Sequence, residues 1–134
     1  MTKQVTGVRK LKSWEDTTYS EVGDGPKAVR SSIEYEYTGD IQGTAKLEYV
    51  MLLHSDDKAT FVGYEQIVGR IGDREGSVVL EHRGKLDENA ATVAMSVLPD
   101  SGTGQLAGAR GEGGFVGVHE DRGDAKYTMD IEFA

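Results

Sequence analysis

The sequence predicts an all-β protein, a single small eight-stranded antiparallel, up-and-down β-barrel that spans residues 1–134. Alternating segments of strand character recur along the chain, and short turn signals separate them. No segment has the capped 3.6-residue period of an amphipathic helix. The 18 glycines and two prolines suit strands and turns better than disorder. Closure into a barrel leaves no exposed strand edge, and a β-sandwich is the alternative.

The first part of the chain is the least regular. Residues 1–13 alternate weakly and are a candidate first strand, whereas residues 14–26 are polar and predict a long loop. Trp14, at the start of this loop, is expected to plug one end of the barrel. The remaining segments with strand character are 28–37, 41–53, 60–71, 75–86, 90–98, 104–108, 114–119 and 126–133.

Four candidate two-residue turns fix a register for the central strands: Gly39-Asp40, Asp56-Asp57, Gly72-Asp73 and Asp87-Glu88. Large and small side chains alternate on one face, as the interior of a small barrel requires, so this face is predicted to point inward. Its residues are Val29, Ser31, Ile33, Tyr35, Tyr37, Glu48, Val50, Leu52, Phe61, Gly63, Glu65, Ile67, Val78, Leu80, His82, Gly84, Leu86, Ala91, Val93, Met95 and Val97.

The same register leaves an apolar stripe pointing outward. The stripe consists of Ile41, Ala45, Leu47, Tyr49, Met51, Leu53 and Val62. Either a β-bulge near Lys46 turns this strand over and buries the stripe, or a partner subunit or a terminal segment covers it. In the second case the outer face from Ile41 to Leu53 is a candidate surface for a homo-oligomer.

Two carboxylates and a histidine fall on the predicted inner face. Glu48 and Glu65 lie in neighbouring strands, and His82 is a diagonal neighbour of Glu65. Two carboxylates in an apolar cavity do not both stay ionised easily, so one has a raised pKa or His82 takes a proton. Glu65, His82 and Glu48 are therefore candidate catalytic acid–base groups. A structural hydrogen-bond network is the alternative.

A ligand inside the barrel is predicted to contact Tyr35, Phe61, Leu80 and Met95. Arg110 lies in the glycine-rich stretch 101–115 and is expected to turn inward toward an interior carboxylate. The stretch lacks a Gly-Lys-Ser/Thr end and a following helix, so a phosphate loop is rejected and a sharply bent strand pair is favoured. Glu48, Glu65 and His82 lack the spacing of a metal site, and neither a metal nor another cofactor is expected.

Composition narrows the function classes further. The chain has no cysteine, which excludes disulfides and thiolate chemistry. The net charge of −8 is dispersed, and no basic surface for nucleic acid is visible. No apolar run of about 18 residues predicts a membrane span. With no secretory signal at the N-terminus, a cytoplasmic location is expected.

Several motifs together resemble the domain of unknown function 3224 family. They are Tyr37-Thr-Gly-Asp-Ile-Gln-Gly, Thr60-Phe-Val-Gly-Tyr-Glu-Gln, Leu80-Glu-His-Arg-Gly and the glycine-rich stretch from Ser101 to Phe115. The resemblance covers nearly the whole chain and implies an eight-stranded barrel similar to allene oxide cyclase and dirigent proteins. Such relatives guide cyclisations or radical couplings by the shape of a cavity, which is an analogy of fold.

Three functions follow as hypotheses. The first is a barrel that binds a small hydrophobic or aromatic molecule in its interior. The second is a cofactor-free isomerase or cyclase that uses Glu65 or Glu48, with His82, as acid and base. The third is a filled barrel that acts through its outer surface, with the stripe from Ile41 to Leu53 as the interface.

Overall fold

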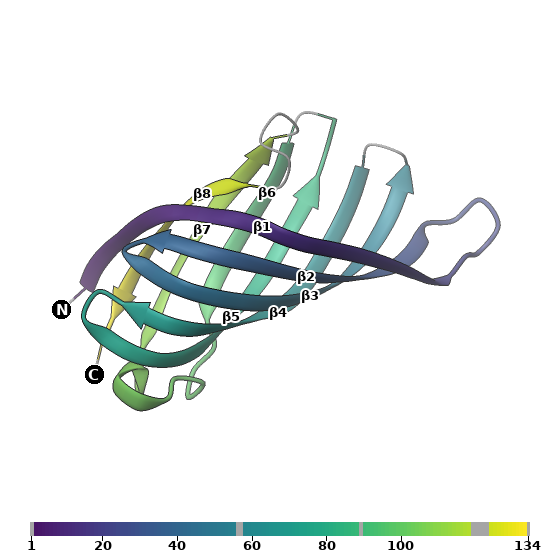
Figure 1. Cartoon of the computed structure of the whole chain (residues 1–134). Coiled ribbons are helices and arrows are strands. Elements are labelled where there is room, and N and C mark those ends of the chain that lie inside the picture. The colour runs from purple at the N-terminus through teal and green to yellow at the C-terminus, as the bar shows by residue number, and fades with distance from the viewer. Residues whose placement is uncertain (1, 56–57, 89, 119–123, 134) are drawn as a thin grey trace.

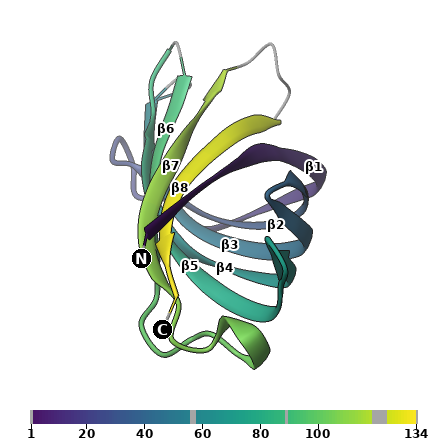
Figure 2. The same cartoon turned by 90° about the vertical axis from the view of Figure 1, so that its left-hand side faces the viewer.

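The computed structural model describes residues 2–55, 58–88, 90–118 and 124–133. These residues form eight strands that pair antiparallel in sequence order, and β8 returns to β1 to close the barrel (Figures 1 and 2). The predicted all-β, up-and-down barrel is therefore confirmed. The elements are β1 (Thr2–Ser20), β2 (Lys27–Gly39), β3 (Ile41–Ser55), β4 (Lys58–Ile71), β5 (Arg74–Leu86), β6 (Ala90–Val97), the 3-10 helix η1 (Gly104–Leu106), β7 (Arg110–Val118) and β8 (Ala125–Glu132).

Strand β1 is longer than predicted, because residues 14–20 of the loop expected at 14–26 are part of it. β1 pairs with β2 from Gly7 to Ser20, but with β8 only from Thr2 to Arg9. A register shift between Leu11 and Ser13 bends the strand. Beyond Arg9 the strand has one neighbour instead of two, and its side chains are mostly exposed. This exposure explains why the segment looked like a polar loop.

The predicted face of β3 is wrong, and the first cause is the β2–β3 turn. Tyr37 pairs with Gly43, where a two-residue turn requires Gln42. The turn is centred on Asp40, whose backbone N–H donates to the Thr6 carbonyl and whose carboxylate accepts from the Thr6 N–H, both at 2.9 Å. Because this turn has an odd number of residues, odd-numbered side chains of β2 and β3 share one face.

A second difference occurs where β3 meets β4. Ser55 pairs with Lys58, as the predicted turn requires, although Asp56 and Asp57 themselves lie outside the described residues. A register shift between Leu53 and Ser55 then pairs Leu53 with Ala59. The two differences cancel, so the face predicted for β4 is correct.

The apolar stripe of β3 therefore lines the interior instead of the outer face. No register shift occurs near Lys46 in the described pairing, so a bulge there is not the cause. The buried members of the stripe are Ile41, Ala45, Leu47, Tyr49 and Met51. Glu48, Val50 and Leu52, which were predicted inside, are exposed, and Val62 is exposed as predicted.

The β5–β6 turn is also longer than predicted, without consequence for the faces. Leu86 pairs with Ala91 rather than Asn89, a shift of two residues that preserves which side chains point inward. Val93, Met95 and Val97 are accordingly buried as predicted.

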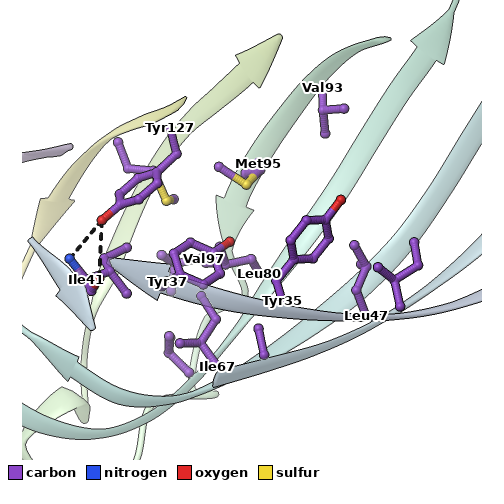
Figure 3. Packing of buried hydrophobic residues seen from close by; sticks show 14 of the residues in the cluster. Tyr35, Tyr37, Ile41, Leu47, Ile67, Leu80, Val93, Met95, Val97 and Tyr127 are labelled. Carbon is purple, nitrogen blue, oxygen red and sulfur yellow. Dashed lines mark hydrogen bonds between the residues drawn. The ribbon is translucent and has the colours of Figure 1, made fainter. Parts of the chain in front are cut away.

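The 3-10 helix η1 packs against β5. The strand predicted at 104–108 is wrong, because Gly104–Leu106 forms this short helix and buries Leu106. The chain approaches itself closely there, and a Cβ atom at Gly102 would collide with the Leu106 carbonyl. Nearby, the Tyr127 hydroxyl accepts from the Ile41 N–H at 2.8 Å and donates to the Thr38 carbonyl at 3.0 Å (Figure 3 shows the Ile41 side).

Candidate functional site

A fully buried arginine organises the polar groups inside the barrel. Arg9 projects inward from β1, and its Nη2 donates to Glu65 Oε2 at 3.0 Å. Its Nε donates to the Tyr37 hydroxyl at 2.9 Å. The guanidinium carbon lies 3.9 Å from the centroid of the Tyr35 ring and 4.1 Å from that of Phe115. The cation is thus held by hydrogen bonds along one edge and by two aromatic rings.

Glu65, on β4, is the anion of this network. Its Oε1 accepts from the Tyr37 hydroxyl and from His82 Nε2, each at 2.8 Å. Burial alone would raise the pKa of this carboxyl, but the charge of Arg9 and the hydrogen bonds outweigh burial and lower it. Glu65 is therefore a fixed anion at neutral pH, which is the wrong state for a general acid.

The hydrogen bonds also assign the protons of His82. Since the ionised Glu65 carboxylate only accepts, His82 Nε2 carries a proton. Burial lowers the pKa of His82, so the ring is neutral and its Nδ1 is an acceptor. Nδ1 lies 2.8 Å from the Tyr49 hydroxyl, which therefore donates to it. Tyr49, His82 and Glu65 form a directed chain of hydrogen bonds.

A cavity of about 380 Å³ opens at the end of the barrel where β5 joins β6. Its wall consists of Leu11, Trp14, Tyr35, Tyr49, Met51, Phe61, Leu86, Ala90, Ala91, Phe115, Gly117 and Val118. Tyr35, Tyr49 and Phe115 belong to this wall and also contact Arg9 or His82. The cavity therefore has an aromatic wall and a polar network beside it.

The structure brings together some of the predicted site residues. Glu65 and His82 are in contact, as their diagonal placement predicted. Tyr35 and Phe61 line the cavity, and Trp14 lies on its wall with 41% of its surface exposed. Leu80 and Met95 are buried in the core but are not among the residues that line the cavity.

Two predicted site residues lie elsewhere. Glu48 points to the outer surface because of the β3 register, and its carboxylate accepts from the Ser32 hydroxyl at 2.8 Å. Arg110, at the start of β7, is exposed. Alternation along β7 places Gly111, Gly113 and Phe115 on one face and Arg110 on the other. Arg9 contacts the interior carboxylate in place of Arg110.

Arg9 and Tyr49 were missed for different reasons. Arg9 shares the odd-numbered face of β1 with Val5 and Leu11. This alternation could have indicated that Arg9 points inward, but the alternation in this segment is weak. Tyr49 was assigned to the outer face by the error in the β3 register.

The network predicts an acid-sensitive fold. The unfolded chain takes up protons at His82 below about pH 6.5 and at Glu65 below about pH 4.5, whereas the folded state resists both because its pKa values are lowered. The contribution of these two groups to the free energy of unfolding is therefore fully present above about pH 6.5, and it is lost as the pH decreases. Urea unfolding between pH 8 and pH 3 measures this, and His82→Gln should flatten the decline above pH 4.5. A wild-type stability that is constant from pH 7 to pH 4 would contradict it.

In the described part of the chain, no group of three histidine, aspartate or glutamate side chains is arranged to hold a metal ion. None of the described helices is long and apolar enough to cross a membrane.

Comparison with known proteins places the chain beside others of unknown function. The family model described as protein of unknown function (DUF3224) matches residues 5–131. A crystal structure of a protein of unknown function from the DUF3224 family of Shewanella oneidensis MR-1 has a TM-score of 0.83 at 24% sequence identity. The similarity covers 100% of this chain and 99% of that one, and at this identity it concerns the fold. No curated protein matches the chain.

Proposed function

The chain belongs to the DUF3224 family, and from the geometry of its barrel we propose that it binds a small, flat, apolar or aromatic molecule in the cavity. The observation that carries this proposal is the cavity itself. Its volume of about 380 Å³ lies in the range of small-molecule sites. Five aromatic side chains line it, namely Trp14, Tyr35, Tyr49, Phe61 and Phe115.

The packing of these rings supports a flat ligand. Tyr49 lies 4.6 Å from Phe61 and 6.5 Å from Trp14 between ring centroids, so the three rings form a continuous surface. Aromatic rings prefer offset or edge-to-face contact with other rings. A planar guest can make such contacts without changing the barrel.

Blocking the cavity tests this proposal. A Cβ atom at Gly117 meets no other atom within 4 Å, although Gly117 lines the cavity. Gly117→Leu should therefore fill the space without disturbing the core. A library of small aromatic metabolites is screened by thermal shift against the wild type and this variant. A ligand at about 100 times its Kd stabilises the folded state by about 2.7 kcal/mol.

The expected result is that compounds stabilise the wild type and not Gly117→Leu. Val116→Leu is the matched control, because Val116 is the neighbouring residue and is exposed on the outer face. It should respond to ligands as the wild type does. Compounds that stabilise all three proteins equally bind elsewhere, and a screen without any stabilising compound contradicts the proposal.

The chain of hydrogen bonds from Tyr49 favours a second candidate function, a cofactor-free isomerase. In this candidate Tyr49 Oη takes a proton from a carbon next to a carbonyl of the bound molecule, while its own proton passes to His82 Nδ1. The resulting imidazolium is stabilised by the Glu65 anion, and the proton returns to a different carbon. Glu65 acts here by orienting and stabilising His82.

Hydrogen exchange on the ligand tests this second candidate. A carbonyl compound that stabilises the wild type should exchange carbon-bound hydrogen for deuterium in D2O, as followed by NMR. Tyr49→Phe should bind the compound but lose the exchange, since the ring remains and the hydroxyl is removed. Equal exchange in both proteins would contradict a role for Tyr49, while the binding proposal would stand.

A further inference from the structure

We propose that the ligand of the cavity carries an oxygen acceptor, a carbonyl or carboxylate, and that Arg9 Nη1 donates to it. This inference rests on the proposed function and specifies its ligand class. The remaining nitrogens of Arg9 are engaged, since Nη2 donates to Glu65 and Nε donates to Tyr37. Nη1 is fully buried and, among the described residues, is the one buried side-chain polar atom without a hydrogen-bond partner.

An unpaired donor in a protein interior is costly. A buried polar group without a partner destabilises the folded state by about 1–3 kcal/mol, and more when it is charged. Native proteins leave few such groups, and those that remain often mark a function. Arg9 is a charged group of this kind, and none of its side-chain surface is exposed to water. A ligand oxygen at Nη1 would complete its hydrogen bonds.

The position of the guanidinium connects it to the cavity. The rings of Tyr35 and Phe115 both contact it, and both are part of the cavity wall. The guanidinium therefore lies directly behind this part of the wall. Phe115 is partly exposed, so its side chain has room to turn. A guest that displaces this ring stacks on the guanidinium plane or reaches its edge.

The same contacts argue against a cationic ligand. Aromatic cavities bind quaternary ammonium groups through ring faces. Here the positive charge of Arg9 already occupies the faces of Tyr35 and Phe115, and it would repel a second cation. The planar N–H groups of arginine match carbonyl and carboxylate oxygens instead. A flat ring system can pack against the aromatic wall, while its oxygen acceptor takes a hydrogen bond from Arg9 Nη1.

The test compares probes of one shape by calorimetric titration of the wild type. The probes are 2-ethylnaphthalene, which lacks an acceptor, 2-acetylnaphthalene, which has a neutral carbonyl, and 2-naphthoate, which has a carboxylate. Trimethylphenylammonium represents cations. At least one oxygen-bearing probe should bind roughly tenfold more tightly than the hydrocarbon, as one hydrogen bond to a charged donor predicts. The two oxygen probes distinguish a neutral from an anionic ligand.

Arg9→Lys assigns the preference to the guanidinium, because it keeps the charge and replaces the three guanidinium nitrogens by a single ammonium nitrogen. In this variant the oxygen preference should be lost while the hydrocarbon affinity stays within about threefold. If Arg9→Lys does not fold, NMR of arginine side chains in the wild type replaces it. The Arg9 Nη1 resonance should then shift with the favoured oxygen probe and not with 2-ethylnaphthalene.

The outcomes separate this inference from the proposed function. Equal affinity for all naphthalene probes, tighter binding of the cation, or an oxygen preference that persists in Arg9→Lys overturns the inference and leaves binding in the cavity intact. An Arg9 resonance that does not respond overturns it in the same way. Failure of every probe, together with an empty metabolite screen, overturns both.

Discussion

Replacing Glu65 by glutamine is expected to lower the free energy of unfolding by about 3–5 kcal/mol. The substitution removes the negative charge that faces Arg9 at 3.0 Å, and both side chains are fully buried. A buried guanidinium without its anion is a large penalty, because the protein interior solvates charge poorly. Urea or guanidinium unfolding at neutral pH, followed by circular dichroism, measures the loss.

Glu48→Gln is the matched control. Glu48 is the other carboxylate that the sequence placed inside, but its side chain is 58% exposed. Its replacement should change stability by less than about 0.5 kcal/mol. The double variant Arg9→Met/Glu65→Gln removes both charges and should recover part of the loss. Equal effects of Glu65→Gln and Glu48→Gln would show that the Arg9–Glu65 pair does not organise the core.

Replacing Gly63 by alanine is expected to destabilise the barrel by about 1–3 kcal/mol. Gly63 is buried on β4 opposite Tyr49 on β3. A Cβ atom there would overlap the Glu48 carbonyl oxygen and lie 2.8 Å from Cδ1 of the Tyr49 ring. The ring or the strand must move, and the Tyr49–His82 hydrogen bond moves with it.

Gly117→Ala isolates the effect of crowding. It introduces the same methyl group on β7, where no atom lies within 4 Å of the added Cβ atom. Its stability should stay within about 0.5 kcal/mol of the wild type in the same unfolding experiment. If both alanine variants are equally stable, the close contact between Gly63 and Tyr49 is not part of the packing in solution.

The fold could be predicted from the sequence because turn and alternation agree along β4 and β5, and alternation continues in β6. Gly72-Asp73 forms the predicted turn, and Ile71 pairs with Arg74. This one register places Glu65 and His82 on the same face as diagonal neighbours. Their contact therefore follows from local turn chemistry and the two-residue period of a strand.

The face of β3 could not be predicted, because a tertiary contact sets its turn. Asp40 is held by Thr6 of β1, which is distant in the sequence, and this contact adds one residue to the turn. The shift between Leu53 and Ser55 is likewise a feature of the folded sheet. A difference of one residue moves a whole strand to the other face. For this reason Glu48 was placed in the site and Tyr49 was left out.

The partner of Glu65 could not be predicted either. The sequence contains both Arg9 and Arg110 as possible partners of the interior carboxylate. Arg110 was predicted because it lies in a glycine-rich stretch, where its side chain was expected to turn inward. Arg9 is the one that projects inward, and Tyr37 of the neighbouring strand β2 bonds both Arg9 and Glu65. The Arg9–Glu65 contact joins β1 to β4 inside the barrel, and local patterns carry little information about contacts between strands that do not pair.

The most direct test of binding in the cavity is a 1H–15N NMR titration of the wild type with 2-acetylnaphthalene. The chain has one tryptophan, so the indole N–H signal belongs to Trp14 on the cavity wall. We predict that this signal and the amide of Gly117 shift with the same saturation curve, while the amide of the outward-facing Tyr64 does not. Shifts confined to outer residues such as Tyr64, or no shifts at all, would contradict ligand binding inside the barrel.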